Sequence, residues 1–209
     1  MTGLARTYRT SFLELAILLG YKAAIPVEAV EIADLFAWSI VFHPLMKILY
    51  LLRHAKSSWD DPELKDFERP LASRGIDDVP VMAARFQGRG GQLACIICSP
   101  ANRAKSTARL FAKNIEFDVG DIISNPELYF AGTPMFLKAA SHVDETCDSA
   151  MLVGHNPAIT EFANAMVNCD IDNIPTCGLV EMRLPIEHWN DIDTGTADLL
   201  EFDYPKKST

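Results

Sequence analysis

Positive charge is scarce in this chain, and that shortage limits the partners it can bind. Its 209 residues include 19 lysine and arginine against 28 aspartate and glutamate, which gives a formal net charge of −9 at pH 7. Proteins that bind nucleic acid neutralise its phosphates with clustered basic side chains. The charge balance therefore argues against a nucleic-acid binder, although it leaves room for a local cationic pocket that takes one phosphate group.

Cysteine is also scarce, and its spacing does not form a disulfide framework. There are five cysteines, an odd number: Cys95, Cys98, Cys147, Cys169 and Cys177. The first two form a C-x-x-C pair, but the two isoleucines between them indicate a buried strand, and the sequence offers no second pair to complete a zinc site. We expect reduced, buried thiols in a cytoplasmic protein.

Long apolar runs are missing as well. A membrane-spanning helix needs about 18 consecutive apolar residues. The nearest candidates, Phe12–Leu19 and Leu35–Leu45, are broken by Glu14 and by His43 with Pro44. Glu14 also interrupts the apolar centre that a secretory signal requires. We therefore expect neither a membrane span nor a secretory signal.

The first 45 residues differ in character from the rest of the chain. Residues 1–45 hold two apolar, loosely helical segments separated by Ile25-Pro26, and they contain no motif. Three interpretations of this N-terminal extension stay open: a helical appendage, an organelle-targeting segment, or translated sequence upstream of a true start at Met46. The sequence predicts that residues 46–209 form the functional domain.

From Met46 onward, strand-like and helix-like segments alternate. Short apolar runs predict strands, the first of them buried on both faces. The strands are expected at residues 48–52, 95–98, 121–124, 150–153, 179–184 and 197–202, and the helices at 75–86, 101–112, 134–142 and 157–167. Pro80 suits the first helix only near its start. The alternation predicts a three-layer α/β/α sandwich with a mostly parallel central sheet.

Polar residues suited to phosphate binding follow three of these strands. Arg53 and His54 end the first strand, Arg103 follows the second, and His155 ends the strand at 150–153. Open α/β sheets bind ligands beyond the carboxyl ends of their strands. We therefore expect two histidines and two arginines to converge on one phosphate-sized site.

Two helix starts are expected at the same edge of the sheet. Ser99 and Asn156 are suitable N-cap residues, and each is followed by proline, which favours the first helical position. Helix N-termini carry free N–H groups and a partial positive charge, so they would favour an anion there.

The chemistry of phosphoryl transfer explains why these residue types are needed. The transferring group carries negative charge on three oxygens, which the rigid cationic fork of arginine matches. A neutral imidazole can attack phosphorus and hold the group covalently, provided that its other nitrogen donates to a fixed acceptor, which we expect to be a backbone carbonyl. This chemistry requires no metal or other cofactor, and the adjacent arginines would repel a metal cation.

Three ordered motifs resemble those of the histidine phosphatase superfamily. They are Leu-Arg-His-Ala-Lys-Ser at residues 52–57, Ser-Pro at 99–100 with Arg-Ala at 103–104 and Thr-Ala at 107–108, and Val-Gly-His-Asn-Pro at 153–157. Asp-Phe-Glu-Arg-Pro-Leu at 66–71 and Arg-Gly at 74–75 narrow the resemblance to the compact SixA-type phosphohistidine phosphatases. The resemblance covers nearly all of residues 46–202 and implies a phosphoglycerate mutase-like fold.

The resemblance also implies roles for individual residues. His54 would be the nucleophile, and Arg53, Arg103 and His155 would form the rest of the phosphate pocket. In larger members a carboxylate before the fourth strand protonates the leaving group, and Glu127 lies in the comparable interval. Compact members are often described as lacking a clear acid.

Two further basic residues lie near the first motif. Lys56 and Arg69 either line the rim of the pocket or pair with the nearby carboxylates Asp60, Asp61 and Asp66. Of these two interpretations we favour the rim.

The sequence therefore predicts a metal-independent phosphatase that forms a covalent phosphohistidine. Short intervals between the motifs leave little room for insertions that would enclose a small metabolite, so phosphohistidine on a protein is the expected substrate. A small phosphoester is the alternative substrate. A mutase is less compatible, because it must retain its intermediate and exclude water. A non-catalytic phosphoprotein-binding module would lack the nucleophile or an arginine, and this sequence has both.

Overall fold

The structure is a computed structural model, and it describes residues 46–207. The predictions made for residues 1–45 lie outside the described residues and stay predictions. Within the described part, no helix is long and apolar enough to cross a membrane.

Across residues 46–207, six strands form one sheet in the order β3-β2-β4-β1-β5-β6. The first four strands of the chain run parallel to one another, and β5 is antiparallel to both of its neighbours, β1 and β6. The bounds are Lys47–Arg53 for β1, Cys95–Cys98 for β2, Ile123–Ser124 for β3, Ser149–Gly154 for β4, Leu179–Leu184 for β5 and Asp198–Asp203 for β6.

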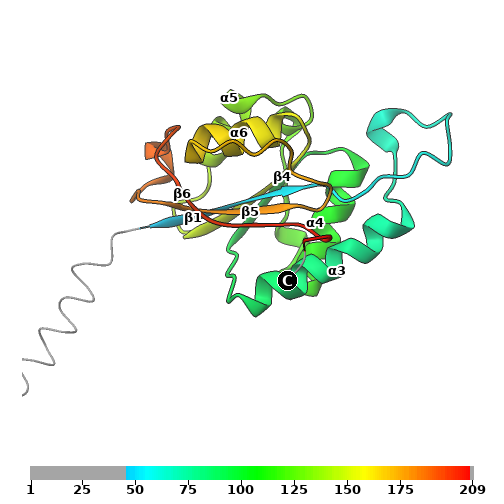
Figure 1. Ribbon diagram of the computed structural model, residues 1–209, viewed down its shortest axis with the longest axis horizontal. Coiled ribbons are helices and arrows are strands. Elements are labelled where there is room, and N and C mark those ends of the chain that lie inside the picture. The colour runs from blue at the N-terminus through cyan, green and yellow to red at the C-terminus, as the bar shows by residue number, and fades with distance from the viewer. Residues whose placement is uncertain (1–45, 208–209) are drawn as a thin grey trace, which may run out of the picture. The chain divides into compact units, whose positions relative to one another are not determined.

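Helices cover both faces of this sheet. They are α3 (Ser73–Gly88), α4 (Asn102–Asn114), α5 (Thr133–Ser141) and α6 (Ala158–Val167). Figure 1 shows α5 and α6 on one face and α3 and α4 on the other. Single-turn 3-10 helices lie in the connections: η1 (Asp66–Glu68), η2 (Val119–Asp121), η3 (Pro126–Leu128) and η4 (Trp189–Asp191). The expected three-layer α/β/α sandwich is therefore confirmed.

The first strand shows why the sequence folds in this way. Leu49 and Leu51 are fully buried in the core beneath α5 and α6, whereas Tyr50 and Leu52 are buried in the core beneath α3 and α4. Alternate residues of a strand point to opposite faces, so a strand covered on both faces is apolar at every position. Each of these side chains contributes roughly 1.5–3 kcal/mol by leaving water.

Every expected strand and helix is present, with its ends shifted by no more than one or two residues. Pro80 needs comment, because it was expected to suit this helix only near its start. α3 begins at Ser73, so the proline lies in the interior of the helix. Proline lacks the N–H that would bond the carbonyl of Ile76, but Ile76 lies on an exposed part of the helix, where water can take over that carbonyl.

The described cysteines are free thiols, as expected. Cys95, Cys98 and Cys177 are buried, and Cys147 and Cys169 are partly exposed. Burial raises the pKa of the Cys95 and Cys177 thiols to about 12, which keeps both protonated at neutral pH. The expectation that the thiols are buried therefore holds for three of the five.

Candidate active site

The two predicted histidines meet at the carboxyl edge of the sheet. β1 and β4 are neighbouring parallel strands in which Arg53 pairs with Gly154, so His54 and His155 leave the sheet side by side. Their ring centroids are 5.0 Å apart, and both side chains are buried. Arg103 donates a hydrogen bond from Nε to Nε2 of His54 at 3.3 Å. The structure thus brings together the residues that the sequence placed at one site.

The orientation of the His54 ring is fixed by the main chain. Nδ1 lies 2.8 Å from the carbonyl oxygen of Ala55, and the N–H of Ala55 is in turn bound by Oγ1 of Thr107 at 2.9 Å. The Thr107 hydroxyl donates to the carbonyl of Arg103 at 2.7 Å. Because a carbonyl only accepts, Nδ1 carries the hydrogen, and the lone pair of the neutral ring lies on Nε2.

Burial keeps this imidazole neutral. The pKa of His54 is lowered to about 3, mainly by burial and in part by the nearby His155, Arg103 and Arg53, against the opposing effect of the hydrogen bond to Ala55. At neutral pH Nε2 therefore carries a lone pair, which can attack an electrophile once the hydrogen bond from Arg103 is released.

His155 has the complementary arrangement. Its Nε2 lies 2.8 Å from Oγ of Ser99, and its buried Nδ1 has no hydrogen-bond partner within residues 46–207. Burial, together with Arg103, lowers the pKa of His155 to about 4. If the Ser99 hydroxyl donates to Nε2, the hydrogen of the neutral ring lies on Nδ1. His54 then offers a lone pair to the site, and His155 offers an N–H.

Ser99 and Asn156 do not cap helices, so that prediction was wrong. The N-cap residues of α4 and α6 are Ala101 and Pro157, and neither makes a side-chain cap bond. The Ser99 hydroxyl bonds His155 instead. The Asn156 amide group donates to Asn173 at 2.6 Å, and its oxygen accepts from Thr160 at 3.0 Å.

Arg103 lies in the first turn of α4 and is held by a carboxylate that sequence reasoning did not assign to the site. Asp66 of η1 accepts from Nη2 of Arg103 at 2.9 Å through its carboxylate and from Nη1 at 2.6 Å through its backbone carbonyl. Tyr129 donates its hydroxyl to the same carboxylate oxygen at 2.9 Å. The sequence signal was the Asp-Phe-Glu-Arg-Pro-Leu motif, in which Asp66 was considered only as an ion-pair partner.

Arg53 is held by a different segment, at Asn173 and Ile174. Nη1 donates to the carbonyl of Ile174 at 2.6 Å and to Oδ1 of Asn173 at 3.2 Å. Its buried Nε has no partner within the described residues. The Nε of Arg53 is thus an N–H donor available to an anion, and so is the Nδ1 of His155 in the tautomer in which Ser99 donates to Nε2.

Arg69 takes the ion-pair alternative rather than the rim. Its buried guanidinium donates to Asp66 Oδ1 at 3.3 Å, to Ser57 Oγ at 2.9 Å and to the Ser58 carbonyl at 3.0 Å. The same group stacks on Trp59, with 3.2 Å between Cζ and the ring centroid. These contacts fold the loop that carries Asp66 back toward Arg103.

The side chains of Lys56 and Glu127 are both exposed to solvent. Lys56 is exposed, and its ammonium makes no hydrogen bond to the described part of the chain. The Glu127 carboxylate pairs with Lys138 at 2.7 Å on the exposed surface of η3. The roles suggested for both residues stay predictions.

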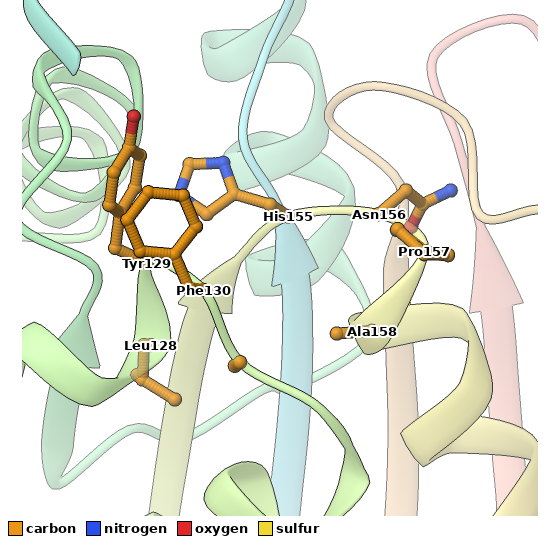
Figure 2. Close-up of a pocket in the computed structure, with 8 residues that line it drawn as sticks. Leu128, Tyr129, Phe130, His155, Asn156, Pro157 and Ala158 are labelled. Carbon is orange, nitrogen blue, oxygen red and sulfur yellow. The ribbon is translucent and has the colours of Figure 1, made fainter. Parts of the chain in front are cut away.

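A cavity of about 280 Å³ opens beside His155. Residues 128–131 and 155–158 line it. Figure 2 shows the Tyr129 and Phe130 rings on one side, Asn156, Pro157 and Ala158 on the other, and the His155 ring between them. The site therefore joins a compact group of N–H donors to an adjoining hollow with mostly apolar walls.

Comparison with known proteins supports one family for this arrangement. Residues 49–128 match the model of the histidine phosphatase superfamily (branch 1). An uncharacterised protein of Mycobacterium tuberculosis is 25% identical over 165 residues, which cover 74% of this chain and 100% of the relative. An uncharacterised chloroplastic protein of Arabidopsis thaliana is 27% identical over 152 residues, covering 68% of this chain and 69% of the relative.

Solved structures show the same fold. A protein from Agrobacterium tumefaciens, provisionally assigned as phosphohistidine phosphatase SixA, has a TM-score of 0.65 at 28% sequence identity and covers 76% of this chain and 98% of its own. The protein histidine phosphatase SixA complexed with tungstate has a TM-score of 0.65 at 17% identity, covering 76% and 97%. At the lower identity the likeness concerns the fold alone.

Proposed function

Since the chain belongs to the histidine phosphatase superfamily and is a phosphatase, we propose that it hydrolyses phosphohistidine on a protein through a covalent intermediate at His54. The observation that carries this proposal is the fixed tautomer of His54. Its Nδ1 donates to the Ala55 carbonyl, and its Nε2 lies beside the guanidinium of Arg103.

In the first step, Nε2 of His54 attacks phosphorus. A new P–N bond forms to Nε2, the bond between phosphorus and the leaving group breaks, and the leaving group takes the electron pair and then a proton. Arg53, Arg103 and the Nδ1 hydrogen of His155 stabilise the charge on the three phosphoryl oxygens. Arg103 already donates to Nε2 and must turn from it toward those oxygens when substrate binds.

In the second step, water attacks the phosphorus of the phosphorylated His54. The P–N bond breaks, Nε2 regains its lone pair, and inorganic phosphate leaves. The hydrogen stays on Nδ1 and remains hydrogen-bonded to the Ala55 carbonyl throughout. The ring therefore returns to the tautomer that attacks phosphorus. Splitting the displacement in this way replaces one difficult step by two easier ones.

A phosphohistidine substrate suits a site in which the one candidate general acid, Glu127, is paired with Lys138. We propose Glu127 as the donor for substrates that need one, after a change of its pairing with Lys138. Departing imidazole is a good leaving group and needs less help. The likeness to the Agrobacterium protein assigned as a phosphohistidine phosphatase supports the same substrate class.

Two basic residues are proposed to act around the site rather than on phosphorus. Lys56 lies two residues after the nucleophile and is exposed, so it can meet an incoming phosphorylated protein. Arg69 positions the loop that carries Asp66.

The decisive experiment measures phosphate release from a phosphohistidine-bearing carrier protein in excess EDTA, beside a phosphoserine peptide and sugar phosphates. We expect the carrier to be the best substrate, EDTA to have no effect, and His54→Ala to lower release to the uncatalysed background. Acid-labile phosphate should be trapped on His54 after rapid denaturation of the wild type.

His142→Ala provides the matched control, because His142 is an exposed histidine at the end of α5. It should release phosphate at the wild-type rate. Full activity in His54→Ala would overturn the proposed nucleophile. A preference for sugar phosphates would instead favour a small-molecule phosphatase.

A further inference from the structure

The cavity beside His155 has no part in the steps above. We propose that it is the leaving-group subsite and that it takes a flat, uncharged ring, such as the imidazole of a phosphohistidine side chain. This inference rests on the proposed function, because it requires the phosphoryl group to sit at the pair of His54 and His155.

The location of the cavity suits this role. His155 lines the cavity and also faces the nucleophile, with 5.0 Å between the centroids of the two histidine rings. The Tyr129 ring, which also lines the cavity, lies at a centroid distance of 5.8 Å from His155. A substituent on a phosphoryl group held by the two histidines therefore lies next to the cavity.

The walls offer few free polar groups. None of the residues that line the cavity in the described part of the chain is Lys, Arg, Asp or Glu. The Tyr129 hydroxyl is bound to Asp66, and the Asn156 side chain is bound at both ends, to Asn173 and Thr160. A sugar or a second phosphate would find few side-chain hydrogen bonds here to replace those to water, whereas a flat ring needs fewer.

Phe130 supplies the surface on which such a ring can stack. Its side chain is 87% exposed, and its ring centroid is 4.2 Å from that of Tyr129. Tyr129 is fixed from the other side by Phe67, whose ring lies perpendicular to it at 5.1 Å. Figure 2 shows the Phe130 ring across the cavity from Pro157. A bound ring would cover part of this exposed aromatic face.

The size of the cavity limits what it can hold. Its volume of about 280 Å³ lies just below the range of roughly 300–1,000 Å³ that is typical of pockets for drug-sized ligands. A single heteroaromatic side chain fits such a space, and the protein that carries it remains outside, past the exposed Phe130.

The test compares two phosphoramidates that differ only in the leaving group. Phosphoramidate itself releases ammonia, which is too small to reach Phe130, and a phosphohistidine peptide releases an imidazole. We expect Phe130→Ala to lower the ratio of kcat/KM for the peptide to kcat/KM for phosphoramidate by roughly 3- to 10-fold, the effect of losing one aromatic contact. Val81→Ala, a truncation of a 45% exposed side chain on α3, should leave the ratio at the wild-type value.

Two further variants separate stacking from simple apolar contact. Phe130→Trp retains a ring face and should keep the wild-type ratio, whereas Phe130→Leu should behave like Phe130→Ala. An unchanged ratio in Phe130→Ala, or full recovery in Phe130→Leu, would overturn the subsite. If the wild type hydrolyses neither compound, or if His54→Ala is as active as the wild type, the proposed function itself fails and the subsite falls with it.

Discussion

Asp66 holds Arg103 by two hydrogen bonds, one from Nη2 to its carboxylate at 2.9 Å and one from Nη1 to its backbone carbonyl at 2.6 Å. Burial raises the pKa of the Asp66 carboxyl, but hydrogen bonds from Tyr129 and Arg103 outweigh this effect and hold the pKa below its usual value. The carboxylate is therefore ionised at neutral pH. Asp66 thus holds beside His54 the guanidinium that we assign to the phosphoryl oxygens.

Removing this carboxylate should weaken catalysis more than it weakens the fold. The Asp66 side chain is 55% exposed, so its loss leaves no large cavity. A guanidinium displaced by about 1 Å can cost up to about 100-fold in rate, and we expect a loss of that order in kcat/KM for Asp66→Ala, with a smaller loss for Asp66→Asn. Steady-state kinetics on a phosphohistidine peptide, with thermal unfolding in parallel, measures both effects.

Asp77→Ala is the control for this prediction, because Asp77 is an exposed carboxylate on α3. It should keep wild-type kinetics. Wild-type kcat/KM in Asp66→Ala would show that Arg103 keeps its orientation without Asp66.

Ser99→Ala should disturb the tautomer of His155 while leaving its position unchanged. Without the hydroxyl at 2.8 Å, Nε2 loses its partner and the ring hydrogen is no longer held on Nδ1. We expect kcat to fall by about 10-fold and the free energy of unfolding to fall by about 1–3 kcal/mol, the cost of an unsatisfied buried group. Ser99→Thr retains the hydroxyl and should restore most of the activity, and ¹⁵N NMR of His155 reports the tautomer directly. An unchanged tautomer in Ser99→Ala would remove Ser99 from the mechanism.

Much of the fold could be predicted from apolar patterns alone. The uninterrupted apolar run from Leu49 to Leu52 is typical of a strand buried on both faces, and the structure has one there. The helical spacing of apolar residues predicted the bounds of α6 to within one residue. The helix predicted at residues 75–86 contains Pro80 in its interior, as does the observed α3.

The candidate site was predicted in part. The residues that end β1 and β4 had to meet, because neighbouring parallel strands in register bring them together. Asp66 reaches the site through a loop folded by Arg69, and Ser99 bonds His155 rather than a helix N-terminus. Such long-range hydrogen bonds leave no periodic pattern in the sequence. Glu127 was placed by its interval in the sequence alone; its carboxylate pairs with Lys138 in the structure, and its role stays a prediction.

The buried histidines should make stability depend on pH between about pH 4 and 6.5. His54 and His155 have folded-state pKa values of about 3 and about 4, whereas an unfolded histidine titrates near 6.5. Between these values the unfolded state binds more protons, so the free energy of unfolding contributed by the two groups is fully present above about pH 6.5 and decreases as pH falls. Urea unfolding at pH 5.0 and pH 7.5 should show a smaller pH difference for the variant His54→Gln/His155→Gln than for the wild type. His142→Gln, which changes an exposed histidine, should behave as the wild type does, and an equal pH difference in all three proteins would contradict the prediction.

Gly75 and Gly88 lie on the same helix and should respond oppositely to alanine. A Cβ at Gly75 would lie 2.2 Å from the carbonyl oxygen and 2.9 Å from the nitrogen of Lys56, both backbone atoms that cannot turn away, whereas a Cβ at Gly88 meets nothing within 4 Å. Gly75→Ala must therefore push α3 away from the loop that follows His54, at a cost of about 1–3 kcal/mol in the free energy of unfolding.

The same displacement should reach the active site, because the Lys56 backbone that Gly75 contacts lies two residues from His54. We expect Gly75→Ala to lower kcat/KM as well as stability, and Gly88→Ala to keep full activity with a gain of up to about 1 kcal/mol from better helix propensity. Urea unfolding and steady-state kinetics on both variants check this contrast. Equal behaviour of the two would mean that the close approach of α3 to Lys56 does not constrain the position of the nucleophile.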